Sequence, residues 1–138
     1  MIVKTLDQIL GTEDDVHAET WNSRRLLLRR DGVGFSMHDT IMKAGTKTFM
    51  WYANHIEAVY CVEGEGEIED HATGRKHAVR PGTLYCLDKH DKHTVSPRTD
   101  LRMICVFNPA VTGHEVHDER GVYPLITDDE PAPKAAAG

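Results

Sequence analysis

Residues 45–67 read GTKTFMWYANHIEAVYCVEGEGE, and residues 80–93 read RPGTLYCLDKHDKH. Each segment combines short apolar runs with glycines, a pattern typical of a strand, a tight turn and a second strand. Each also carries a possible metal ligand, Glu57 in the first segment and His93 in the second. Two separated strands that bring an oxygen and a nitrogen ligand to one place indicate the metal pocket of a small β-barrel.

The rest of the chain repeats this pattern of short strands and glycine turns. We expect about ten strands and almost no helical periodicity, which predicts an all-β fold with short helical segments. The expected strands include residues 21–30, 35–41, 48–52, 57–62, 67–69, 77–79, 83–87, 94–96 and 101–108. A helical turn is expected within residues 1–10, where Thr5 can act as the N-cap and Gln8 follows three residues later. Residues 11–15 read as a polar loop.

Side-chain alternation assigns residues to faces in two of the expected strands. In residues 35–41, Ser36, His38 and Thr40 alternate with larger or charged side chains, so this face meets either water or a polar cavity. The strand that begins at Trp21 places Trp21, Ser23, Arg25 and Leu27 on one face.

The composition excludes several classes of partner. A net charge of −6 over 138 residues argues against binding to nucleic acid or to an anionic membrane. The longest apolar run, residues 26–28, is far too short to span a membrane, and no secretory segment follows Met1. The three cysteines, Cys61, Cys86 and Cys105, lie in strand-like runs. We expect them to be reduced and mostly buried, which favours the cytoplasm.

The chain has room for one domain with one core. We expect this domain to span residues 1–126. Residues 127–138 combine charge, proline and alanine without an apolar pattern, so we expect a disordered tail.

The first segment resembles the first motif of the cupin superfamily. Gly45, Glu57 and Gly64 occupy the glycine, glutamate and second glycine positions, whereas Trp51 and Ala53 replace the two histidines. In the second cupin motif, Gly82 and His93 fit, while Asp88 and His90 replace a proline and a glycine. The resemblance implies a small single-domain cupin barrel, a double-stranded β-helix of the jelly-roll type.

A third metal ligand is required, because a metal held firmly with open positions needs at least three protein ligands. His55 lies two residues before Glu57, so both side chains point the same way on an extended strand. With His93 they would form the two-histidine, one-carboxylate triad of an iron oxygenase. Tyr85 is the other candidate, since a metal can bind its phenolate. His90 is expected at the surface or behind the ligands.

A closer resemblance covers residues 1–125, which are similar to the ectoine synthases. It is carried by residues 15–21, 34–40, 54–70, 87–93, 105–109, 113–118 and 121–124. The resemblance implies a homodimer and an iron site formed by Glu57, Tyr85 and His93, with other divalent metals possible in vitro. It implies substrate contacts at Trp21, Arg25, Thr40, Tyr52, Cys105, Phe107, Glu115 and His117.

The reaction implied is the closure of N-γ-acetyl-2,4-diaminobutyrate to ectoine, a compatible solute, with loss of water. An amide is a poor electrophile, so a metal acting as Lewis acid suits this hydro-lyase chemistry. Glu115 is the first choice to take a proton from the attacking amine, and Tyr52 would donate a proton or orient the substrate. Arg25 and Thr40 would hold the carboxylate, with Trp21 and Phe107 as walls, and His117 completes the catalytic set.

Three further expectations follow. Residues 113–125 are a polar segment between glycines and Pro124, and we expect them to close over the pocket as a lid. Among enzymes, an iron oxygenase that uses His55, Glu57 and His93 is the alternative. Outside enzymes, the alternative is a cupin that binds a small molecule without catalysis.

Overall fold

The computed structural model describes residues 1–113 and contains ten strands, one short α-helix and one 3₁₀ turn in that part of the chain. Their bounds are α1 Leu6–Ile9, β1 Asp15–His17, β2 Trp21–Leu27, the turn Arg29–Asp31, β3 Ser36–Met42, β4 Thr48–Met50, β5 Ile56–Glu63, β6 Gly66–Asp70, β7 Lys76–Val79, β8 Leu84–Leu87, β9 His93–Pro97 and β10 Leu101–Asn108. The all-β prediction is confirmed.

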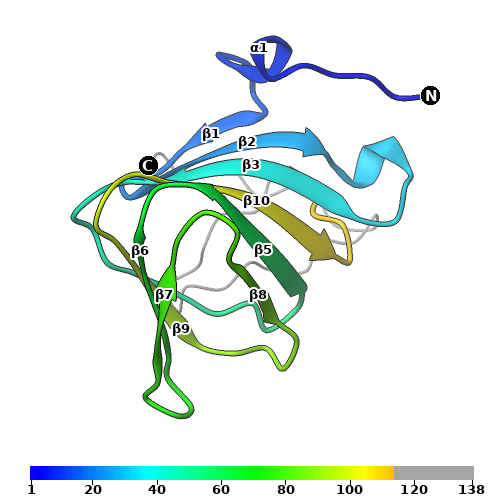
Figure 1. The fold of residues 1–138 in the computed structure, drawn as a ribbon. Helices are drawn as coiled ribbons and strands as arrows, with labels where there is room; N and C mark the ends of the chain where they lie inside the picture. Colours follow the sequence, from blue (N-terminus) through cyan, green and yellow to red (C-terminus); the bar gives the residue numbers. More distant parts are fainter. Residues whose placement is uncertain (114–138) are drawn as a thin grey trace.

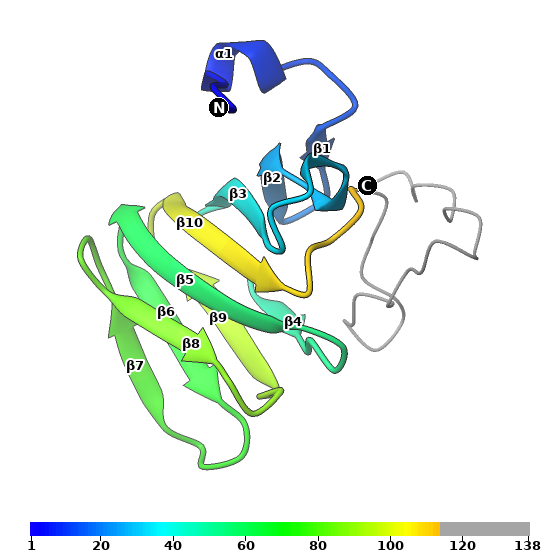
Figure 2. The same ribbon diagram turned by 90° about the vertical axis from the view of Figure 1, so that its right-hand side faces the viewer.

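The strands form two antiparallel sheets that face one another (Figures 1 and 2). The larger sheet has the order β1-β2-β3-β10-β5-β8, and the smaller has the order β4-β9-β6-β7. Strands distant in sequence are therefore neighbours, as in β10, which pairs with both β3 and β5. This double-sheet arrangement is that of a jelly-roll barrel.

The core lies between the sheets, because alternate residues of each strand point inward. In β10 the buried positions are Leu101, Met103, Cys105 and Phe107. The larger sheet also contributes Met42, Val59 and Cys61, and the smaller sheet contributes Met50, Ile68, Val79 and Val95. The same inward faces carry the polar residues described below.

The glycine turns predicted from the sequence lie between strands as expected. Gly64, in the turn between β5 and β6, has a φ of +90°. A Cβ at this position would collide with the carbonyl oxygen of Asp100, so both the backbone conformation and the space require glycine.

Three local predictions need correction. Asp15, expected at the end of a polar loop, instead begins strand β1 and pairs with Arg24 of β2. The strand expected to reach Arg30 ends at Leu27, after a register shift against β3 between Arg25 and Leu27. Cys86 is exposed, because it lies on the outward face of β8 at the edge of the larger sheet.

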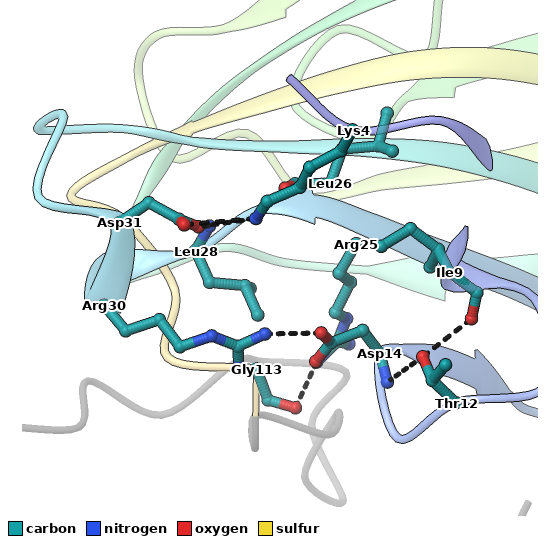
Figure 3. A network of polar contacts seen from close by, with 10 residues as sticks. All are labelled: Lys4, Ile9, Thr12, Asp14, Arg25, Leu26, Leu28, Arg30, Asp31 and Gly113. Atoms are coloured by element: carbon teal, nitrogen blue, oxygen red, sulfur yellow. Dashed lines mark hydrogen bonds and ion pairs between the residues drawn. The ribbon is translucent and has the colours of Figure 1, made fainter. Parts of the chain in front are cut away.

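The N-terminal segment forms a hydrogen bond to β2 and an ion pair to the turn that follows it (Figure 3). The predicted helical turn is present, and Gln8 Oε1 accepts a hydrogen bond of 2.9 Å from the Thr5 amide. Lys4 Nζ donates to Leu26 O at 2.8 Å and forms an ion pair with Asp31. These contacts fix the outer edge of β2, whose inner face contributes to the cavity.

Strand β3 carries an ionic group on its outer side. The Asp39 carboxylate accepts hydrogen bonds from Arg24 at 2.6 Å and from Arg102 at 2.7 Å. Burial alone would raise the pKa of Asp39, but the hydrogen bonds from Arg102 and Arg24 outweigh it and lower that pKa. Asp39 therefore links β2, β3 and β10 from behind.

Within the described residues, the one α-helix is far too short to cross a membrane.

Candidate active site

One cavity between the sheets gathers most of the side chains that the sequence analysis selected. Its lining residues come mainly from β2, β3, β5, β8 and β10, and are Trp21, Ser23, His38, Thr40, Met42, Met50, Tyr52, Glu57, Val59, Tyr85, Met103, Cys105 and Phe107. The candidate ligands Glu57 and Tyr85 thus share a cavity with five of the predicted substrate contacts.

Glu57 is a buried carboxyl group on the inward face of β5. Burial raises its pKa to about 8, although the Cys105 thiol donates a hydrogen bond to it. No Lys or Arg within residues 1–113 forms an ion pair with Glu57. A buried carboxylate without a cation is costly, so this position favours a bound cation or a proton.

Tyr85 lies on β8, opposite Val59 of β5, and its hydroxyl approaches Met103 Sδ at 3.9 Å. Burial and the nearby Glu57 carboxyl raise the pKa of Tyr85 well above its ordinary range. Tyr85 also lines a second, larger cavity of about 730 Å³ between β8 and the smaller sheet, where His93 is found. The Tyr85 and His93 ring centroids are 6.5 Å apart.

His93 opens strand β9 and is 1% exposed. Its Nδ1 lies 2.9 Å from the carbonyl oxygen of Asp91, and a carbonyl can only accept a hydrogen bond. Burial lowers the pKa of His93, so the neutral ring carries its proton on Nδ1. Nε2 then presents a lone pair, and it is buried without a hydrogen-bond partner within residues 1–113.

These three side chains fit a divalent metal by their chemistry. Glu57 offers an uncompensated carboxylate, Tyr85 a phenol oxygen, and His93 an orphaned imidazole lone pair whose other nitrogen is held by a backbone carbonyl. That backbone contact is the usual support of a metal-binding histidine. Mixed nitrogen and oxygen donors suit iron among other divalent metals.

His55 is buried but does not complete a cluster with the other two ligands. Within residues 1–113, no three His, Cys, Asp or Glu side chains are close enough together to hold a metal ion. The His55 ring packs edge-on against Phe107 at 5.9 Å. His90 lies behind this region, with its Nδ1 2.8 Å from the carbonyl oxygen of Tyr52. The choice of Tyr85 as third ligand stays a prediction.

The predicted substrate contacts lie around this centre. The Tyr52 ring packs edge-on against Phe107 at 5.1 Å and lies 6.0 Å from the His93 ring. Cys105 lines the cavity with Thr40 and Glu57, and burial and the Glu57 carboxyl raise the pKa of its thiol well above the ordinary range. Arg25 is 1% exposed and donates to Ser23 Oγ and to the carbonyl oxygen of Gly113 (Figure 3).

Several predictions lie outside the described residues. They are the catalytic and substrate-binding roles of Glu115 and His117, the lid over residues 113–125 beyond Gly113, and the tail over residues 127–138.

Two polar cavity residues, Ser23 and His38, were absent from the predicted site. Alternation in the sequence placed His38 on a polar face and Ser23 on the same face as Trp21 and Arg25, and the structure shows that both residues line the cavity. Alternation identifies a face but not what it contacts, so the sequence alone left that choice open.

With this geometry in place, the chain can be compared with known proteins. A family model described as ectoine synthase matches residues 1–127. The L-ectoine synthase of Thermobifida fusca is 60% identical over 129 residues, which cover 94% of this chain and 96% of the relative.

The chain belongs to the ectoine synthase family.

A solved structure supports the family assignment. The crystal structure of ectoine synthase from P. lautus is 55% identical, covers 95% of this chain and 96% of its own, and superposes with a TM-score of 0.83. The sequence-based assignment to ectoine synthases, and to enzymes of the hydro-lyase type, is confirmed.

The cupin prediction is confirmed as well. A cupin domain of an Enterobacter cloacae transcriptional regulator is 16% identical and gives a TM-score of 0.54 over 65% of this chain and 97% of that domain. At this identity the likeness concerns the fold alone.

Proposed function

We propose that this chain closes N-γ-acetyl-2,4-diaminobutyrate to ectoine with loss of water. A new C–N bond forms between the α-amine and the acetyl carbon, and the C–O bond of the acetyl group breaks. The two N–H protons of the neutral amine leave with the oxygen as water. The site must therefore activate an amide, hold an amine beside it, and move two protons.

We assign the metal to Glu57, Tyr85 and His93, with Fe²⁺ as the metal expected. When bound, it supplies Lewis acidity toward the amide oxygen. The walls formed by Trp21 and Phe107 keep bulk water from the site, which disfavours the reverse hydrolysis.

The polar residues bind the substrate carboxylate and transfer the protons. The buried Arg25 cation and the Thr40 hydroxyl can donate hydrogen bonds to the substrate carboxylate. The Tyr52 hydroxyl lies 3.3 Å from Met50 Sδ, and both residues line the cavity, so we assign Tyr52 the donation of a proton to the departing oxygen. The free amine has a pKa near ~8 and must be neutral to attack. Glu115 is our proposal for the group that takes its proton, and His117 is the other residue to which we assign a catalytic role.

The observation that carries the proposal is the gathering, in one cavity, of Glu57 and Tyr85 with Thr40, Tyr52 and Cys105. The test is to supply N-γ-acetyl-2,4-diaminobutyrate and Fe²⁺ to the purified protein without oxygen. Formation of ectoine is expected. Turnover that requires oxygen and consumes it would favour the oxygenase instead, and tight binding without turnover would favour a non-catalytic cupin.

We propose a homodimer with the outer face of β5 and β8 as its contact. Ile56, Tyr60 and Leu84 are exposed on these strands, and Tyr60 lies opposite Leu84 in the sheet. Strand β8 is also the edge of the larger sheet. A second copy of this chain would cover the apolar side chains and the strand edge. Sedimentation should give a dimer that Leu84→Asp weakens, whereas Phe49→Ser, on the exposed face of β4, should not.

We further propose that the enzyme works in the cytoplasm and makes a compatible solute under osmotic stress. The three cysteines are free thiols in the structure, which suits a reducing compartment. Fractionation of salt-stressed cells, with ectoine measured in parallel, tests both statements.

A further inference from the structure

A buried imidazole lines the cavity that holds Glu57 and Tyr85, and the proposed mechanism does not use it. His38, on β3, is 1% exposed and lines the cavity. Its Nε2 is buried and has no hydrogen-bond partner within residues 1–113. Buried polar atoms of native proteins nearly always have a hydrogen-bond partner. A buried nitrogen without one, on a side chain that lines a cavity, is therefore expected to form its hydrogen bond with the bound ligand.

The neighbours of His38 decide which ring nitrogen carries the proton. Ser23 Oγ lies 3.3 Å from His38 Nδ1 and also accepts a hydrogen bond of 3.4 Å from Arg25 Nε. Within residues 1–113 these two groups are the hydrogen-bond partners of Ser23 Oγ, and arginine can only donate, so His38 Nδ1 is the acceptor available to the serine proton. The serine hydroxyl then points its own proton at Nδ1, which acts as acceptor. Nε2 consequently carries the ring proton.

Arg25 is held in place for this arrangement. Its Nη1 donates to the carbonyl oxygen of Gly113 at 2.8 Å (Figure 3). The donor chain from Arg25 through Ser23 to His38 runs in one direction, and each hydrogen bond polarises the next.

The His38 ring is neutral. Burial lowers the pKa of His38 well below its ordinary range, and the charges of Arg25 and His55 lower it further. A neutral ring with Nδ1 as acceptor has a single N–H, on Nε2, which is a donor without a partner within residues 1–113 on a side chain that lines the cavity.

The strand order separates this donor from the metal ligands. Strands β2 and β3, with Ser23 and His38, lie on one side of β10, and β5 and β8, with Glu57 and Tyr85, lie on the other. Strands β3 and β5 are two strand spacings apart, or about 10 Å. A substrate whose amide oxygen lies toward Glu57 and Tyr85 therefore directs its other polar end toward β2 and β3.

We propose that His38, held by Ser23 and Arg25 with its proton on Nε2, donates a hydrogen bond to the substrate carboxylate and selects for it. This inference rests on the proposed function, because it requires a substrate with an amide at one end and a carboxylate at the other. The group that suits this side is an anion, since Arg25 supplies positive charge and His38 an N–H donor.

The tautomer can be tested without activity. Nitrogen-15 NMR of histidine-labelled protein, loaded with diamagnetic Zn²⁺, should show a neutral His38 ring protonated on Nε2. Ser23→Ala should convert this signal to a mixture of tautomers. A His38 ring protonated on Nδ1 in the wild type would overturn the proposal.

The selectivity is tested with two ligands, the substrate and N-acetyl-1,3-diaminopropane, which lacks the carboxylate. His38→Leu should weaken binding of the substrate, measured by calorimetry, roughly ten- to a hundredfold, while binding of the analogue is unchanged. His38→Gln places an amide N–H near the position of Nε2 and should recover part of the substrate binding that His38→Leu loses. This second variant keeps the test decisive if the leucine variant does not fold.

Met37→Leu, on the same strand with its side chain on the opposite face, is the matched control and should behave as the wild type. Equal losses for both ligands in His38→Leu and His38→Gln would place His38 away from the carboxylate and overturn the proposal. A wild type that binds the substrate but forms no ectoine would refute the proposed reaction. The binding of the two ligands would still show whether His38 contacts the carboxylate.

Discussion

Two buried histidines, His38 in the cavity with Glu57 and His93 in the neighbouring cavity that Tyr85 also lines, differ in the group that Nε2 can bind. His93 and His38 are both 1% exposed, and both have an Nε2 without a hydrogen-bond partner within residues 1–113. At His93 the partner of Nδ1 is a backbone carbonyl, which leaves a lone pair on Nε2. At His38 the partner is a serine hydroxyl whose other neighbour, Arg25, can only donate, so the serine donates to Nδ1 and the ring proton is on Nε2. The group behind the ring thus decides whether a histidine suits a metal or an anion.

The largest expected effect is that of replacing a proposed metal ligand. Glu57→Ala and His93→Ala should each lose most of the bound metal and nearly all cyclisation, because two ligands are too few to hold an open site. Metal content by elemental analysis and ectoine formation are the measurements. His38→Leu is the control and should keep its metal. Full metal and full activity in either ligand variant would refute the assigned centre.

A second prediction separates Tyr85 from His55 as third ligand. A phenolate on ferric iron absorbs in the visible, so oxidation of the iron-loaded protein should produce colour. Tyr85→Phe keeps the ring and removes the oxygen, so it should abolish both the absorption band and most of the activity without unfolding the protein. His55→Ala should keep the band. Colour that survives Tyr85→Phe, or metal loss in His55→Ala, would return the third position to His55.

A third prediction separates folding from recognition on strand β3. Asp39→Asn should destabilise the protein by about 3 kcal/mol at neutral pH, because it leaves buried Arg24 without its ion pair. The folded-state pKa of Asp39 is lowered, so its contribution is present above the ordinary aspartate range and is lost as the pH falls through that lowered value.

Urea unfolding at two pH values measures this effect. The difference between wild type and Asp39→Asn should narrow in acid, and the selectivity of the folded variant for the carboxylate ligand should be unchanged. A difference that widens in acid would contradict the assigned ion pairs.

The smallest expected effect concerns Thr40, beside His38 on the inner face of β3. Thr40→Val removes one neutral hydroxyl and keeps the shape, so it should raise the KM for the substrate by about fivefold, or ~1 kcal/mol, with little change in stability. The matched control is Thr48→Val, whose hydroxyl bonds to Thr20 away from the cavity. An unchanged KM in Thr40→Val would remove Thr40 from the carboxylate end.

The sequence indicated much of this fold, because alternation and glycine turns are local signals. Strand β10 and the turn at Gly64 follow from them directly. Strand β1 was not predicted, because it has three residues, two of them polar, and so shows no alternation of apolar and polar side chains. These residues form a strand because they pair with β2.

The candidate site was less accessible to sequence reasoning. Glu57 and His93 were found from their spacing in two motifs. The role proposed for His38 depends on two hydrogen bonds that join Ser23 on β2 to His38 on β3 and to Arg25. Such cross-strand contacts leave no mark in a single sequence, and Ser36, on the same face, gives the same alternation without lining the cavity.

Strand β3 alternates between residues that line the cavity and a residue that joins neighbouring strands, and this pattern matters for altering which substrates the enzyme accepts. Its even-numbered residues 38 and 40 meet the substrate cavity, whereas Asp39 between them joins three strands from behind. A mutant library confined to positions 38 and 40, with Asp39 fixed, should therefore vary which acids are accepted while most members still fold. A library of the same size that includes position 39 should lose most of its members to misfolding before any of them can be screened.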